Sequence, residues 1–243
     1  MQKIIPIKPV TSWSISRYHD YRTCPRKFKL KHLDKIQEPG NDAMTRGNAI
    51  HEAAEKYIRG ELSRLPAELK GFANEFKSLK ALYKAKIHGM AVETTWAFTK
   101  TWDPATWNDW KDCWLRVKLD CAYVVENSVL IVTDWKTGKY RPEQNTDYLE
   151  QLELYALGGL LLYPHIKEVR PRLVYLDAGI VYPPAEEPII YVPGDIKKLQ
   201  KTWQTRVKAM FADKRFAPKP NNGCRWCHYR KSNAANGGGQ CEY

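Results

Sequence analysis

The stretch Val132-Thr133-Asp134-Trp135-Lys136-Thr137-Gly138-Lys139 decides how the rest of this chain is interpreted. An apolar run at residues 129–132 leads into it and predicts a buried strand that ends in a glycine turn. Side chains two apart along a strand point to the same face, so Asp134 and Lys136 are expected side by side. A carboxylate beside an ammonium group can hold a divalent cation and steer a water molecule. A surface ion pair is the alternative, and the tripeptide alone does not decide between them.

The composition describes an ordinary soluble protein with an excess of positive charge. Its 243 residues are 43% hydrophobic and 27% charged, which suits one well-cored domain with additions. The formal net charge of +12 favours a polyanionic partner, either nucleic acid or an acidic membrane surface. No apolar run is long enough to span a bilayer, and the N-terminus lacks the features of a signal peptide. We therefore expect a cytoplasmic protein whose six cysteines are thiols or metal ligands rather than disulfides.

The hydrophobic periodicity predicts an α/β domain around one mixed sheet. Helices are expected after a Ser14 cap and at residues 26–33, 44–58, 66–88, 145–163 and 195–213. Strands are expected at residues 91–100, at 114–125, through Asp134 and at 169–176, with 179–192 as a candidate for one more. The core order is therefore helix, three strands, helix, strand, with added helices at both ends.

A short turn at residues 126–128 predicts that the strand 114–125 and the Asp134 strand form a hairpin. Asp120 and Asp134 lie seven residues on either side of Asn127, so their carboxylates are expected to face each other. Two close carboxylates repel unless a cation lies between them. Mg²⁺ and Mn²⁺ prefer oxygen ligands and keep several waters, which hydrolysis needs. Lys136 could then orient or deprotonate the attacking water and stabilise charge on a phosphate oxygen.

Four motifs follow one another in the order expected of a known family. They are Arg46-Gly47-Asn48-Ala49-Ile50-His51-Glu52, Asp120, Asp134-Trp135-Lys136 and Gln151-Leu152-Glu153-Leu154-Tyr155. Together they resemble the PD-(D/E)XK nuclease superfamily, most closely its RecB-type exonuclease domains. The resemblance covers residues 12–243 and implies a restriction-endonuclease-like core. Each motif alone is weak, whereas the ordered set of four is specific.

The resemblance implies a role for each matching residue. His51, Asp120 and Asp134, with the carbonyl of Trp135, would bind Mg²⁺ or Mn²⁺, and Lys136 would be the catalytic lysine. The chain would then be a divalent-metal-dependent deoxyribonuclease.

Gln151 and Tyr155 lie one helical turn apart, and the resemblance implies that they help to position the lysine or the DNA strand. Packing at a helix edge is the alternative for this pair. His51 could instead be a hydrogen-bonded partner of Glu55 on the next turn. Lys118 departs from the family, which usually carries glycine there, and it adds positive charge near the site.

The cysteines form a second candidate site. Cys224 and Cys227 make a Cys-x-x-Cys pair that needs two more ligands, which Cys241 and Cys24 can supply if the chain ends meet. His228 is an alternative to Cys241.

This cysteine pattern resembles the iron–sulfur nucleases of the RecB-like group, which include AddB and the CRISPR-adaptation nucleases. The resemblance implies a structural [4Fe–4S] cluster in a single nuclease domain, residues 1–243, in which 12–40 and 214–243 form the cluster subregion. Zinc is the alternative occupant, because the same ligands would serve it. Cys113 and Cys121 are expected to be core thiols.

The resemblance implies a DNA exonuclease that hydrolyses phosphodiester bonds from DNA ends in recombination, repair or phage DNA metabolism. It would work in the host cytoplasm if a phage encodes it, with a recombination or replication protein as the candidate partner and no membrane partner. DNA contacts, favouring single strands, are expected at residues 26–31 and at Trp102, Trp107, Trp110 and Trp114, although packing is an equal alternative for each tryptophan. The rival functions are a non-catalytic nucleic-acid-binding or assembly protein and an endonuclease on the same fold.

Overall fold

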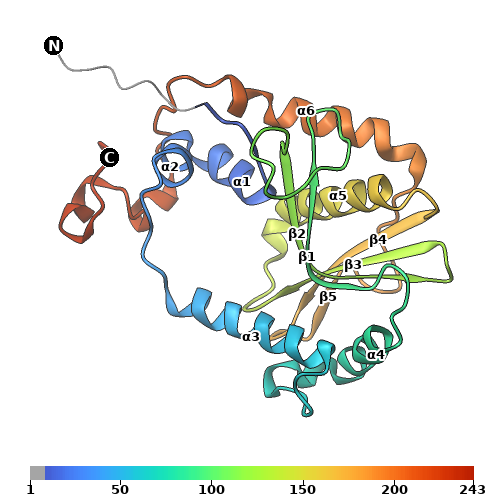
Figure 1. Ribbon diagram of the computed structural model, residues 1–243. Helices are drawn as coiled ribbons and strands as arrows, with labels where there is room; N and C mark the ends of the chain where they lie inside the picture. The colour runs from blue at the N-terminus through green and yellow to red at the C-terminus, as the bar shows by residue number, and fades with distance from the viewer. Residues whose placement is uncertain (1–8) are drawn as a thin grey trace. The chain divides into compact units, whose positions relative to one another are not determined.

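The computed structural model describes residues 9–243, apart from the side chain of Asn145. Residues 1–8, on which the expected lack of a signal peptide depends, lie outside the described part. The described chain divides into two compact units (Figure 1). The first combines residues 9–40 with 201–243, and the second holds residues 41–200. That the whole chain, 1–243, is one domain stays a prediction.

The second unit is built on a five-stranded mixed sheet. Its strands are β1 (Ala91–Phe98), β2 (Leu115–Val125), β3 (Val129–Lys136), β4 (Glu168–Tyr175) and β5 (Ile180–Tyr182), in that spatial order. Only β3 and β4 are parallel; the other neighbours are antiparallel. A parallel pair needs a crossover connection, and helix α5 (Asn145–Leu162) provides it between β3 and β4. The predicted α/β fold class and its core order are confirmed.

Helices cover both faces of this sheet (Figure 1). On one face, α3 (Asp42–Arg59) and α4 (Ala73–Lys84) bury Ile50 and Phe76 in a core with Trp135. On the other face, α5 presents Gly158 closely to Trp96 of β1. α5 is apolar around most of its circumference, and a helix of this kind is typically buried on most sides, as α5 is.

The prediction of one helix over residues 66–88 was wrong in its bounds. A 3₁₀ helix, Ala67–Phe72, comes first, and α4 follows it from Ala73 to Lys84. The chain cannot continue as a helix because Lys86 adopts a left-handed backbone with φ of 52°.

The candidate strand at residues 179–192 is mostly not a strand. Only β5 forms there, together with a single bridge between Val169 and Tyr191. Prolines lack the N–H that a ladder needs, and the interrupted part contains Pro183, Pro184 and Pro188.

The first unit joins segments from the two ends of the chain. Its regular elements are α1 (Ile15–Thr23), α2 (Pro25–Phe28), a π-helical turn (Lys29–Leu33), α6 (Ile196–Ala212) from Lys201 onward, and 3₁₀ helices at Asn222–Trp226 and Lys231–Asn236. Ser14 caps α1 as predicted. Trp13 stacks on Trp203 with ring centroids 5.3 Å apart. Among the described helices, none is long and apolar enough to cross a membrane.

Candidate active site

The β2–β3 hairpin brings the two aspartates together. Cys121 pairs with Thr133, so the next positions outward are Asp120 and Asp134. Asp120 is 4% exposed and Asp134 is 8% exposed. The main-chain N–H of Trp135 donates a hydrogen bond to Asp120 Oδ2 over 2.6 Å. Two buried carboxylates therefore meet at the end of the hairpin.

Helix α5 holds one oxygen of Asp134. Tyr155 OH and Gln151 Nε2 donate hydrogen bonds to Asp134 Oδ1 over 2.5 Å and 3.0 Å. Gln151 and Tyr155 also bond to each other over 2.7 Å, as their spacing of one helical turn permits. The pair thus contacts the carboxylate directly. That it helps to position the lysine or the DNA strand stays a prediction.

The other oxygen, Asp134 Oδ2, lies 2.7 Å from Lys136 Nζ. This contact is an ion pair. Asp134 Oδ2 is buried, and no residue between 9 and 243 donates a well-formed hydrogen bond to it. Strand alternation places these two side chains on one face of β3, as predicted from the sequence.

Helix α3 directs His51 toward the carboxylates. His51 Nδ1 lies 3.2 Å from Asp120 Oδ1 and 3.4 Å from Glu93 Oε1. Glu55, the alternative partner considered for His51, instead makes an ion pair with Arg59 over 2.7 Å. Burial alone would lower the pKa of His51, but its close contacts with Asp120 and Glu93 and the nearby negative charges raise it to about 10.

Glu93 is a site residue that sequence reasoning missed. It lies on β1 between the pairs Val92–Cys121 and Thr94–Leu119, opposite Asp120. Its φ of 47° is strained for a residue with a side chain, and such strain is typical of functional sites. Its carboxylate also lies 2.8 Å from Lys118 Nζ. The β1–β2 register places Glu93 opposite Asp120. That register cannot be predicted from the sequence, because a long loop connects the two strands.

The charges at this site favour a bound cation. Burial, and then the charge of Asp134, raises the pKa of Asp120 to about 6. Ligand atoms of His51, Glu93 and Asp120 all lie within 4.8 Å of one another. Glu93 Oε1 is buried and has no well-formed hydrogen bond among the described residues. Carboxylates crowded in this way are stabilised when a cation lies between them. They line an open cleft of about 940 Å³.

A sequence profile described as the PD-(D/E)XK nuclease superfamily matches residues 12–232. The chain belongs to this superfamily. Nucleases of the PD-(D/E)XK superfamily usually use Mg²⁺ or Mn²⁺, and the family implies DNA as substrate.

Two solved structures are similar to this PD-(D/E)XK chain. A provisionally named exonuclease from Eubacterium rectale is 11% identical, with 93% of this chain and 88% of that chain covered and a TM-score of 0.46. A protein called SSO0001 is 12% identical, with coverage of 92% and 85% and a TM-score of 0.41. No curated protein sequence matches the chain.

The four tryptophans expected at DNA do not share one environment. Trp102 and Trp114 are buried and meet edge to face with centroids 5.2 Å apart. For these two the packing alternative holds, because they form the core beneath the β1–β2 loop. Trp107 is half-buried and Trp110 is exposed.

The basic segment 26–31 is largely neutralised within the first unit. Lys27 and Lys31 make ion pairs with Asp20 and Glu38. Lys29 lies 2.5 Å from Asp34. These pairs reduce the positive charge that the sequence suggested this helix would offer to DNA.

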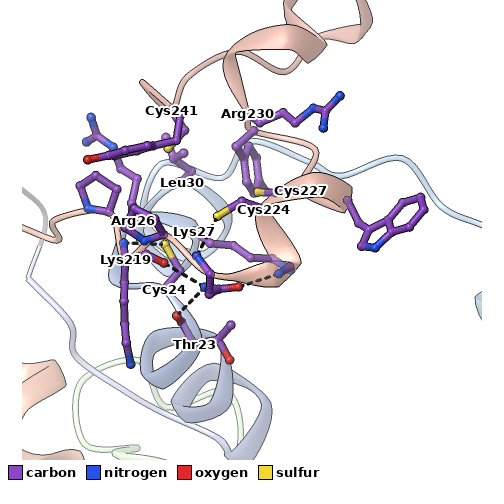
Figure 2. Close-up of a pocket in the computed structure, with 17 residues that line it drawn as sticks. Thr23, Cys24, Arg26, Lys27, Leu30, Lys219, Cys224, Cys227, Arg230 and Cys241 are labelled. Atoms are coloured by element: carbon purple, nitrogen blue, oxygen red, sulfur yellow. Dashed lines mark hydrogen bonds between the residues drawn. The ribbon is translucent and has the colours of Figure 1, made fainter.

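Four cysteines line one cavity of about 160 Å³ in the first unit: Cys24, Cys224, Cys227 and Cys241 (Figure 2). Main-chain N–H groups of Lys219 and Asn221 donate to the sulfurs of Cys24 and Cys224 over 3.5 Å and 3.3 Å. No three cysteine sulfurs within residues 9–243 lie within 4.8 Å of one another, so they do not form a closed single-ion site.

The other cysteine predictions concern the second unit and the alternative ligand. Cys113 and Cys121 are buried, as expected of core thiols. His228, the alternative to Cys241, does not line the cavity, whereas Cys241 does.

Proposed function

We propose that this chain is a divalent-metal-dependent DNA exonuclease that hydrolyses phosphodiester bonds from DNA ends and prefers single strands. The observation that carries the proposal is the meeting of Asp120, Asp134 and Lys136 with His51 in one cleft of a PD-(D/E)XK chain. A net charge of +12 suits a polyanionic substrate. Recombination, repair or phage DNA metabolism is the setting that we propose.

The metal ligands that we propose are His51, Asp120, Asp134 and the carbonyl of Trp135, with Glu93 added from the geometry. Apart from the imidazole of His51, the donors are carboxylate and carbonyl oxygens, which suit Mg²⁺ or Mn²⁺. Buried oxygens without well-formed hydrogen bonds among the described residues, on Glu93 and Asp134, support a cation there. Such an ion, when bound, would polarise a phosphate oxygen and lower the pKa of a bound water.

The chain's own residues have separate roles in the proposal. Lys136, 2.7 Å from Asp134 Oδ2, would orient or deprotonate the attacking water and stabilise charge on the phosphate. Tyr155 and Gln151 fix the Asp134 carboxylate through Oδ1 and leave Oδ2 facing Lys136. Preorganisation of this kind lowers the cost of reaching the transition state.

We also propose a structural [4Fe–4S] cluster held by Cys24, Cys224, Cys227 and Cys241. Support comes from the shared cavity that these four residues line. The same four thiolates would also serve a zinc ion, and the resemblance to the iron–sulfur nucleases is the reason for preferring the cluster. Main-chain N–H donors to two of the sulfurs suit thiolate ligands.

The test compares open and closed DNA. Protein purified without oxygen is incubated with Mg²⁺ or Mn²⁺ and with linear or circular DNA, single-stranded and duplex. We expect linear single strands to be degraded fastest and circles to stay intact. Cutting of circles would identify an endonuclease, and no cutting of any DNA with either metal would overturn the nuclease proposal. Asp134→Asn, purified identically, controls for contaminating nucleases.

A further inference from the structure

Trp110 is exposed on the loop that connects β1 and β2. Its residue surface is 77% exposed, although tryptophan is a costly side chain to leave in water. The loop that carries it is anchored rather than loose. The N–H groups of Ala105 and Trp114 donate to Ala97 O and Phe98 O over 2.8 Å each. A fixed loop therefore presents an indole to solvent.

Arg116 lies against this indole. Its guanidinium is 4.8 Å from the ring centroid of Trp110 and 5.7 Å from that of Trp107. Arg116 Nε donates a hydrogen bond to Trp107 O over 3.1 Å, which fixes the guanidinium. One face of the exposed indole is therefore backed by a positive charge. An arginine stacked on an aromatic ring beside solvent is the kind of platform on which nucleic-acid bases stack.

Arg116 is connected to the acidic cleft by Lys118. Leu115, Val117 and Leu119 of β2 are buried, so Arg116, which is half-buried, and Lys118, which is exposed, lie together on the opposite face about 7 Å apart. Lys118 lines the same cleft as Asp120, and its side chain is 62% exposed. Lys118, although paired with Glu93, and Arg116 thus place two cationic side chains along β2 from the acidic cleft to the loop of Trp110.

We propose that Trp110, backed by Arg116, stacks a base of single-stranded DNA whose backbone runs along Lys118 into the acidic cleft. The inference rests on the proposed nuclease function. It adds the contact, base stacking on Trp110, that would make the site prefer single strands. A free strand can offer the face of a base to an indole, whereas the bases of a duplex already stack on each other. The phosphates of such a strand match the two cationic side chains.

The test measures binding in EDTA, so that it does not depend on cleavage. The probes are a thymidine 12-mer, an abasic 12-mer that keeps the phosphates, and a duplex of the same length. Trp110→Leu removes the aromatic face and keeps an apolar side chain, and Trp110→Phe restores an aromatic ring. We expect Trp110→Leu to weaken thymidine binding roughly tenfold, Trp110→Phe to recover most of it, and abasic and duplex binding to change little.

The outcomes separate this inference from the nuclease proposal. Equal binding of the thymidine 12-mer by wild type and Trp110→Leu would overturn the stacking inference even if the wild type cuts DNA. Equal losses on the abasic and thymidine probes would also overturn it, because the loss would then not involve bases. A base-dependent loss in a protein that cuts no DNA would uphold the stacking contact and defeat the nuclease. Circular dichroism confirms that each variant is folded.

Discussion

The main-chain N–H of Trp135 donates a hydrogen bond to Asp120 Oδ2 over 2.6 Å, joining the two halves of the acidic site. Asp120 therefore has two functions: its charge contributes to the candidate metal site, and its oxygen satisfies a buried donor of β3. The two functions can be separated by substitution, because asparagine keeps an acceptor oxygen and loses the charge.

Asp120→Asn and Asp120→Ala are expected to differ in stability but not in activity. Both remove the charge, so both should abolish metal-dependent DNA cleavage. Only alanine leaves the Trp135 N–H without its acceptor, which costs about 1–3 kcal/mol for a buried donor. Urea unfolding without metal measures the difference. Equal stability of the two variants would show that the hydrogen bond contributes little.

Substitutions at Glu93 separate the effect of its strained backbone on stability from the effect of its charge on metal binding. Glu93→Gln keeps the left-handed backbone and loses the charge, whereas Glu93→Gly also relieves the φ of 47°. We expect both variants to bind Mn²⁺ about 10–100-fold more weakly. We expect the glycine variant alone to gain about 1 kcal/mol of metal-free stability over the glutamine variant. Calorimetric titration and thermal unfolding measure these effects, and unchanged Mn²⁺ affinity in both would remove Glu93 from the site.

Gly158 lets α5 approach β1 closely. A Cβ added there would lie 2.6 Å from Trp96 Cε3, so Gly158→Ala should destabilise the second unit by about 1–3 kcal/mol through overpacking. Gly194 has no atom within 4 Å of such a Cβ and is the matched control. Chemical denaturation of both variants checks this, and a loss no larger in Gly158→Ala than in Gly194→Ala would contradict the close packing.

The cysteine cavity predicts which thiols hold iron. Cys227→Ser should lower the iron content of protein purified without oxygen and weaken the visible absorption that an iron–sulfur cluster gives. Cys113→Ser should not, because Cys113 lies buried in the second unit, where its thiol donates to Leu115 O. Iron, zinc and sulfide analysis decides the occupant. Zinc without iron would replace the cluster with a zinc site, and equal iron in both variants would refute the cysteine assignment.

The sequence predicted the parts of this fold that depend on local pattern. The turn at residues 126–128 set the hairpin register and hence the meeting of Asp120 with Asp134. Helical spacing placed Gln151 and Tyr155 on one side of α5, although not against Asp134 in particular. Such signals depend on residues close together in the sequence, so they can be recognised without knowledge of the fold.

The features that the sequence did not predict depend on contacts between distant segments. Glu93 is one acidic residue in a strand whose register with β2 is set across a long loop. Trp102 and Trp110 have the same side chain and lie on the same loop, but only packing buries one and exposes the other. The ion pairs that neutralise Lys27 and Lys31 likewise form only when the chain folds.

The most direct test of the central claim is the rate of Mg²⁺-dependent cleavage by Lys136→Ala. Tyr155 and Gln151 still hold Asp134 in this variant, so the fold should remain intact. We expect single-turnover cleavage of linear single-stranded DNA to fall by about 10²–10⁴-fold, while the Lys139→Ala variant, which changes an exposed lysine in the same turn, cuts at the wild-type rate. Cleavage by Lys136→Ala at the wild-type rate would contradict the assignment of this site.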